Sequence, residues 1–214
     1  MIESGKFITF EGGEGAGKST VIQAVKADLE AKGFDVVVTR EPGGTPIAEQ
    51  IREVILDVEN TAMAAKTEVL LYAAARAQHL AELVIPNLAA GKIVLCDRFV
   101  DSSLVYQAYA RDLGFDAVYE LNQYAIGACW PEATILLDVT PEVGLARVFA
   151  NRDAGEINRL DQENVAFHQA VYEGYHDLAQ RFADRFIIVD ANQHLTTVIT
   201  ETIQAVSKVV ENVE

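Results

Sequence analysis

Short runs of apolar residues alternate along the chain with longer segments in which apolar residues recur every three to four positions. The short runs are rich in β-branched side chains and predict five strands, at residues 7–10, 34–39, 93–96, 134–139 and 185–190. The longer segments predict helices at residues 21–32, 47–58, 67–90, 102–110, 117–127, 141–150, 162–182 and 195–211. Because most of these strands lack a polar face, they favour a parallel sheet covered by helices on both sides. Five strands alternating with helices predict a doubly wound α/β fold.

Glycine and proline mark where several predicted elements end. Gly33 and Gly91 close two of the helices, and Pro86 predicts a kink near the end of the longest one. No internal repeat, low-complexity tract or Gly/Ser-rich linker divides the sequence, so residues 1–214 are expected to form a single domain. The irregular, charged stretch at about residues 150–160 lies between two predicted helices and is the candidate for a lid.

Charge limits the partners that the protein is expected to bind. The 214 residues include 17 Lys and Arg against 32 Asp and Glu, which gives a formal net charge of −15. Such a surface repels phosphodiester backbones and anionic lipids, so we expect neither nucleic acid polymers nor membranes as partners. Any phosphate that the protein handles is therefore expected to bind in a local pocket.

Targeting signals and metal-ligand patterns are missing from the sequence. It starts without a signal-peptide pattern, and no apolar run approaches the roughly 18 residues of a membrane span, so a cytoplasmic protein is expected. Cys96 and Cys129 have no metal-ligand spacing and are interpreted as buried apolar side chains. The four histidines also lack such spacing, and we assign them no catalytic role.

A glycine-rich segment between the first predicted strand and the first predicted helix fits the pattern GxxxxGK[ST] of phosphate-binding loops. In such a loop, backbone N–H groups converge on phosphate oxygens and the following helix adds the positive end of its dipole. Lys18 would supply charge to the β- and γ-phosphates, and Ser19 would ligate Mg²⁺. The candidate ATP-binding residues are Gly12, Gly13, Glu14, Gly15, Ala16, Gly17, Lys18, Ser19 and Thr20. The alternative, a purely structural turn, leaves the extra glycines unexplained.

Asp97 and Arg98 follow the third predicted strand, at the sheet edge where ligands of parallel sheets bind. Asp97 could hold Mg²⁺ or polarise an acceptor oxygen, and Arg98 offers a planar fork for phosphate. A GTPase switch would need Asn-Lys-x-Asp after a later strand, and the sequence has none. A kinase of a small acceptor and an ATPase or switch without an acceptor both remain open, because one fold carries all of these activities.

Three segments carry more specific patterns: FEGGEGAGKST at 10–20, TREPGGT at 39–45 and LCDRFVDSSLVYQ at 95–107. Together they resemble the thymidylate kinase family, and the resemblance extends along essentially the whole chain. It implies a P-loop NTPase fold like that of nucleoside monophosphate kinases, with a five-stranded parallel sheet sandwiched by helices. It also implies transfer of the γ-phosphoryl group of ATP to dTMP with Mg²⁺, giving dTDP and ADP for dTTP synthesis. A homodimer, formed through long helices such as 67–90, is implied as well. The alternative acceptor is another small nucleotide or nucleoside.

The same resemblance assigns residues to roles. It places Arg98 between the two phosphates, where Arg98, Lys18 and Asp97 would act on the transferring phosphoryl group. Ser103 and Gln107 would hydrogen-bond around the base. The substrate-binding residues that it implies are Glu41, Arg52, Tyr72, Arg76, Arg98, Ser102, Ser103, Tyr106 and Gln107.

Several of these implied roles are specific to one part of the nucleotide. Glu41 would lie near Mg²⁺ or the sugar, Arg52 would clamp the acceptor phosphate, and Tyr106 would crowd the ribose 2′ position. Tyr72 would stack on thymine, and Arg76, four residues later on the same helix face, would contact it. Without the resemblance, Tyr72 would be interpreted as a core residue and Arg76 as a surface residue.

The phosphate loop has no basic residue at its variable positions 13–16, whereas eukaryotic relatives carry one there. The resemblance therefore implies the bacterial arrangement, in which the lid supplies the second catalytic cation. The candidates are Arg147, Arg152 and Arg159, and the last two are favoured because they flank the irregular part of the lid. A solvated charged loop is the alternative for this segment.

Overall fold

Five parallel strands form one sheet in the order β2-β3-β1-β4-β5. The computed structural model of the chain describes residues 5–151, 160 and 163–211. The strands are β1 Phe7–Glu11, β2 Val36–Arg40, β3 Ile93–Asp97, β4 Ala133–Asp138 and β5 Phe186–Asp190. The five predicted strands and their parallel pairing are confirmed, with ends that differ from the prediction by at most two residues.

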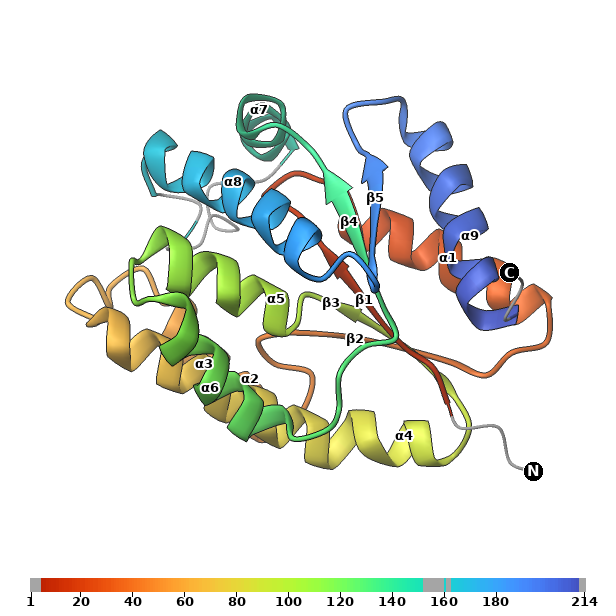
Figure 1. The fold of residues 1–214 in the computed structure, drawn as a ribbon, viewed down its shortest axis with the longest axis horizontal. Coiled ribbons are helices and arrows are strands. Elements are labelled where there is room, and N and C mark those ends of the chain that lie inside the picture. Colours follow the sequence, from red (N-terminus) through yellow and green to blue (C-terminus); the bar gives the residue numbers. More distant parts are fainter. Residues whose placement is uncertain (1–4, 152–159, 161–162, 212–214) are drawn as a thin grey trace.

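Helices cover both faces of the sheet (Figure 1). One layer consists of α1 Lys18–Ala31 and α9 Leu195–Glu211, which pack against each other. The layer on the other face holds α3 Ala65–His79, α5 Val100–Ser103, α6 Phe115–Ile126 and α8 Val165–Arg181, and further helices include α2 Pro46–Leu56 and α7 Pro141–Asn151. No helix in the described part of the chain is both long and apolar enough to cross a membrane.

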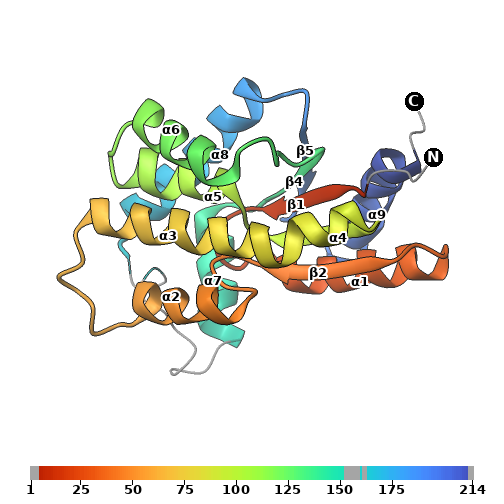
Figure 2. The same cartoon turned by 90° about the horizontal axis from the view of Figure 1, so that it is seen from below.

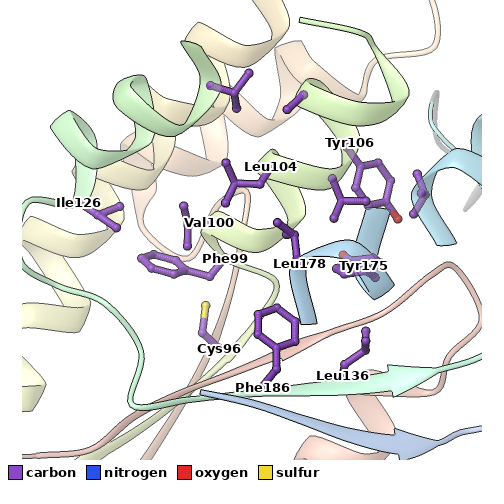
Figure 3. Packing of buried hydrophobic residues seen from close by; sticks show 14 of the residues in the cluster. Cys96, Phe99, Val100, Leu104, Tyr106, Ile126, Leu136, Tyr175, Leu178 and Phe186 are labelled. Carbon is purple, nitrogen blue, oxygen red and sulfur yellow. The ribbon is translucent and has the colours of Figure 1, made fainter. Parts of the chain in front are cut away.

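Alternate residues of each central strand supply two separate cores. In β1, Phe7 belongs to the core under α6 and α8, whereas Ile8 and Phe10 belong to the core under α1 and α9. Figure 3 shows the first of these cores, where Phe99 and Phe186 lie between the sheet and the helices. This double burial explains why the strands read as continuous apolar runs in the sequence.

The longest predicted helix is interrupted by a wider turn. After α3 the chain forms a π-helical segment, η1 Leu80–Val84, and continues as α4 Ile85–Ala89 (Figure 2). Pro86 has no backbone N–H and its ring crowds the carbonyl four residues earlier, which favours a change of helical pitch just before it. The predicted disturbance at Pro86 thus takes the form of a π segment. The predicted helix 102–110 begins earlier, with α5, and is mostly the π segment η2 Leu104–Ala110.

Candidate functional site

The carboxyl ends of three neighbouring strands bring predicted site residues to one edge of the sheet. The phosphate loop leaves β1 at Gly12, Asp97 ends β3, and Arg40 at the end of β2 pairs in register with Asp97. Arg98 has a φ of 67°, in the left-handed region that few non-glycine residues adopt, and its backbone N–H donates to the carbonyl of Phe10 at 2.9 Å. Unusual backbone of this kind is concentrated at functional sites.

The phosphate loop is compact and partly supported by its own lysine. Lys18 opens α1, and its Nζ donates to the carbonyls of Gly12 at 3.1 Å and Gly13 at 3.3 Å. Burial, followed by the charge of a neighbouring arginine, lowers the pKa of Lys18, so an anion beside it would stabilise the charged form. Gly15 has a φ of +70°, and a Cβ there would collide with the carbonyl of Gly144 in α7. The backbones of Gly15 and Gly144 therefore lie so close together that a side chain at position 15 would not fit.

A cavity of about 240 Å³ lies beside the loop. All nine predicted substrate-binding residues line it, and so do Lys18, Ser19 and Asp97. The other lining residues are Glu14, Arg40, Pro42, Leu56, Phe99 and Leu160. Five cationic side chains and three carboxylates are among the lining residues, an excess of two positive charges in a chain whose formal net charge is −15. We call this cavity the acceptor pocket. Its charge suits a phosphate ester.

Arg98 is held by contacts on several sides of its guanidinium. Its Nη2 donates to Glu14 Oε1 at 2.6 Å, and its Nη1 lies 3.2 Å from Ser102 Oγ and 3.3 Å from the Tyr175 hydroxyl. The guanidinium also lies over the ring of Tyr106, 5.0 Å from its centroid. Burial alone would lower the pKa of Arg98, but the contacts with Tyr106 and Glu14 raise it well above its usual value. The pocket therefore holds a permanently charged, pre-oriented cation next to Lys18.

The buried end of the acceptor pocket contains the Tyr72 and Arg76 pair. Tyr72 is 8% exposed and Arg76 only 2%, so the interpretation of Arg76 as a surface residue is wrong. Arg76 Nε donates to Glu41 Oε2 at 2.7 Å, and its Nη atoms donate to Asn122 Oδ1 and to the Phe99 carbonyl. A charged residue reaches this depth only because partners satisfy it on several sides.

Glu41 lines the acceptor pocket, but its carboxylate is engaged inside the protein. Besides Arg76, it contacts His79 Nδ1 at 2.9 Å, and the other ring nitrogen of His79 lies 2.7 Å from Thr39 Oγ1. His79 is completely buried. The Glu41 carboxylate therefore fixes Arg76 in place. The expectation that Glu41 lies near Mg²⁺ or the sugar stays a prediction.

Ser103, the last residue of α5, and Gln107, in η2, also line the acceptor pocket. Ser103 is 2% exposed, and its Oγ has no hydrogen-bond partner among the described residues. The Gln107 side chain donates from Nε2 to Glu68 Oε1 at 2.9 Å. A buried hydroxyl without a partner is costly unless a ligand or water satisfies it. Ser103 thus marks a place where a polar ligand group fits.

Arg40 and Arg52 stand at the more exposed end of the pocket. Arg40 pairs with both oxygens of Glu49, at 2.8 and 3.1 Å, and Arg52 Nη1 donates to the Pro42 carbonyl at 2.7 Å. Burial, and after it the charge of Arg40, lowers the pKa of Arg52. An anion between two guanidinium groups would relieve their repulsion, which makes this end suitable for a phosphate group.

Ser19 and Asp97 lie together, as their predicted role in metal binding requires. Ser19 Oγ donates to Asp97 Oδ2 at 3.2 Å. Within the described residues, no group of three or more His, Cys, Asp or Glu side chains could hold a metal ion. A single carboxylate and a hydroxyl nevertheless fit Mg²⁺ bound to a nucleotide, because this ion takes few protein ligands and fills its octahedron with phosphate oxygens and water.

The predicted lid residues Arg152 and Arg159 lie outside the described residues. Arg147, the third candidate cation, is on α7, and its Nη1 donates to the Ala191 carbonyl at 3.0 Å and the Gly15 carbonyl at 3.5 Å. It lines a second cavity, of about 490 Å³, which shares Lys18 and Ser19 with the acceptor pocket. Arg147 does not line the acceptor pocket itself.

Sequence reasoning missed Glu11, a fully buried carboxylate immediately before the loop. It accepts from the Phe99 N–H at 2.8 Å, from Ser102 Oγ at 2.6 Å and from the Tyr175 hydroxyl at 2.7 Å. Burial, and after it the charge of Asp101, raises the pKa of Glu11. Glu11 ties the strand before the loop to the segment that carries the predicted base-contacting residues. The sequence signal that could have identified Glu11 is a charged residue at the end of an apolar strand.

Comparison with known proteins gives one consistent family. Residues 10–203 match the family model described as "Thymidylate kinase". The chain is 56% identical to a protein named thymidylate kinase from Bacillus velezensis, over 99% of both chains, and 53% identical to one from Geobacillus sp., over 97% of this chain and 98% of that protein. A crystal structure of thymidylate kinase from Ehrlichia chaffeensis matches with a TM-score of 0.75 and 29% identity, covering 95% of this chain and 99% of that one.

Proposed function

The chain belongs to the thymidylate kinase family and transfers a phosphoryl group from ATP to dTMP, and we propose that this transfer takes place between the phosphate loop and the acceptor pocket. The products are dTDP and ADP. The observation that carries the proposal is the position of a cationic pocket, with an aromatic ring and buried polar groups at its closed end, directly beside a phosphate-binding loop. That arrangement accommodates two phosphorylated ligands with their phosphates facing each other.

On the ATP side, the loop residues Gly12 through Thr20 bind the phosphates through backbone N–H groups and the start of α1. Lys18 neutralises charge on the β- and γ-phosphates. Ser19 and Asp97 would hold Mg²⁺, which when bound neutralises phosphate charge and orients the oxygens. Arg98 lies between the two ligands and stabilises charge on the phosphoryl group as it moves. Since this reaction needs little covalent help, positioning and charge stabilisation account for most of the catalysis.

On the dTMP side, the phosphate binds near Arg52 and Arg98, and the base lies on the ring of Tyr72. Arg76 donates to a carbonyl oxygen of the base, and Ser103 hydrogen-bonds at its edge. Tyr106 stands beside the sugar, where a 2′-hydroxyl would crowd it. A pyrimidine with carbonyl oxygens and a ring N–H satisfies these groups better than cytosine, whose exocyclic amine would face the guanidinium of Arg76.

The lid arginines complete the proposal. The phosphate loop carries no basic residue at positions 13–16, and Arg147 donates to the backbone carbonyls of Gly15 and Ala191. Arg152 and Arg159 remain the candidates for a second cation that reaches the transferring phosphoryl group from the lid. Such a cation would act mainly in the transition state, when the phosphoryl charge is shared between donor and acceptor.

A homodimer is also part of the proposal, with a second copy on the outer face of α3, η1 and α4. Exposed residues recur there at helical spacing, and all but the first are apolar: Thr67, Leu70, Ala74, Ala77, Ala81 and Ile85. The exposed fraction of Leu70 is 57% and that of Ile85 is 48%. Small apolar residues at this spacing allow two helices to approach closely. The cytoplasmic location expected from the sequence stays a prediction.

A coupled assay of ADP release tests the function directly. Wild-type protein is supplied with ATP, Mg²⁺ and one acceptor at a time: dTMP, dUMP, UMP, CMP, AMP or none. ADP release should depend on an acceptor and be fastest with dTMP. Equal release without any acceptor would contradict the kinase assignment, and preference for UMP, CMP or AMP would contradict the arrangement proposed for the base.

A further inference from the structure

Glu68 is a buried carboxylate that does not line the acceptor pocket. It lies in the first turn of α3 and is 1% exposed, and its Oε1 accepts from Gln107 Nε2 at 2.9 Å. Gln107 does line the pocket. We propose that Glu68 is a specificity-determining positioning residue, which holds the Gln107 amide so that Oε1, a hydrogen-bond acceptor, is presented to the base. The inference rests on the proposed function, in which the base of dTMP occupies this end of the pocket.

Glu68 also faces a cation, Arg111. Arg111 Nε lies 3.4 Å from one carboxylate oxygen of Glu68, and Nη2 lies 3.4 Å from the other. Arg111 is itself fixed by Glu163 at 2.6 Å and by the ring of Phe167, whose centroid lies 4.7 Å from the guanidinium carbon. A carboxylate beside a guanidinium favours its ionised form.

An ionised carboxylate can only accept hydrogen bonds, and this fixes the orientation of its neighbour. The amide nitrogen of Gln107 must face Glu68, because the amide oxygen would meet another acceptor there. The two ends of a planar amide point in different directions, so Oε1 is turned away from Glu68. No hydrogen-bond partner of that oxygen occurs among the described residues. The oxygen is thus left to accept from a ligand.

An acceptor at this position distinguishes pyrimidines by their ring nitrogen. Thymine and uracil carry N–H at N3 and can donate to Gln107 Oε1, whereas cytosine has an unprotonated N3 that would face the same oxygen. Two buried hydrogen-bond acceptors that face each other, here Gln107 Oε1 and N3 of cytosine, both lose their hydrogen bonds to water and gain none, which weakens binding. A site that accepts a hydrogen bond therefore rejects ligands that lack the donor. Glu68 therefore contributes to the choice of base without touching it.

The test replaces Glu68 with a side chain of the same shape that can donate as well as accept. In Glu68→Gln the Gln107 amide is free to turn, so kcat/KM for dTMP should fall about tenfold, mainly through KM, and the dTMP-to-dCMP ratio of kcat/KM should fall about tenfold. The control is Glu163→Gln. This variant removes the other carboxylate that pairs with Arg111, at a residue that has no hydrogen bond to Gln107. Its dTMP-to-dCMP ratio of kcat/KM should stay within about twofold of the wild-type ratio.

Each outcome of this experiment decides something different. Wild-type protein that does not prefer dTMP would refute the proposed function itself. Selective wild-type protein with an unchanged ratio in Glu68→Gln would overturn only the role of Glu68. If thermal unfolding shows that Glu68→Gln does not fold, the ratio is measured in Gln107→Met, which removes the acceptor and leaves Glu68 in place. An unchanged ratio in that variant would overturn the inference as well.

Discussion

The contact between Glu41 and Arg76 gives a quantitative test of what holds the buried end of the acceptor pocket in place. Both side chains are buried, at 3% and 2% exposure, and their nearest atoms are 2.7 Å apart. Glu41→Gln keeps the size and shape of the side chain but removes its charge. The buried guanidinium of Arg76 then has only neutral partners, Asn122 Oδ1 and the Phe99 carbonyl.

The expected cost follows from the loss of one partner of a buried ion pair, which typically destabilises a protein by 3–5 kcal/mol. Because two neutral acceptors remain, we expect the low end of that range, about 3 kcal/mol. In a chain of this length 1 kcal/mol corresponds to about 2–4 °C in Tm, so Tm should fall by about 6–12 °C. An ion pair in contact with water contributes much less to the free energy of unfolding. For the exposed pair of Lys26 and Glu30, whose charged atoms are 3.6 Å apart on α1, we expect at most about 0.5 kcal/mol.

The assay is urea unfolding followed by circular dichroism, with thermal unfolding as a second measurement. Wild type, Glu41→Gln and the matched control Glu30→Gln are compared without ligand. The two variants carry the same chemical change, one in a buried pair and one in an exposed pair. A loss below about 1 kcal/mol in Glu41→Gln, similar to that in Glu30→Gln, would refute the view that Arg76 depends on a buried counter-charge.

Four further predictions concern two cations of the proposed mechanism, the thiol of Cys129 and the proposed dimer. Lys18→Ala should lower kcat by about a hundredfold or more, because one group that stabilises transition-state charge is commonly worth that much, and substantial retained activity would remove it from the mechanism. Arg152→Ala should lower kcat more than it raises either KM, whereas an effect on KM alone would reassign Arg152 to binding. Burial raises the pKa of Cys129 to about 11, so only about a thousandth of it is thiolate at pH 8, against about a quarter of an ordinary thiol. Iodoacetamide should therefore modify native protein slowly at pH 8 and urea-unfolded protein quickly, and equal rates would contradict the burial. Ala77→Glu should shift the protein from dimer to monomer in light scattering, and an unchanged mass would exclude this face of α3 from the interface.

Features that depend on local sequence could be predicted well. The five strands follow from apolar runs, and the phosphate loop follows from a fixed spacing between a strand and a helix. The π segments η1 and η2 could not be predicted in the same way, because their wider turns change the spacing from which helices are recognised.

The internal support of the site could not be predicted, because it is built from contacts between distant parts of the chain. Tyr175 and Glu11, whose side chains are hydrogen-bonded, are 164 residues apart, and Arg76 and Asn122 are 46 residues apart. His79 illustrates the limit well. Its sequence spacing does not fit a metal site, and nothing near it in sequence indicates that its ring contacts the buried carboxylate of Glu41.

The difference between the charge of the chain and the charge of its pocket explains how an acidic protein can bind phosphates. Three of the five cations that line the acceptor pocket each contact a carboxylate of the chain itself. These carboxylates cancel part of the positive charge, but they also fix each guanidinium before a ligand arrives, which reduces the entropy lost on binding. The side chains that line the pocket, taken together, carry an excess of two positive charges, which matches a phosphate dianion. Binding in this pocket therefore depends on the orientation of a few cations, and the 32 acidic residues of the chain are compatible with it because several of them do the orienting.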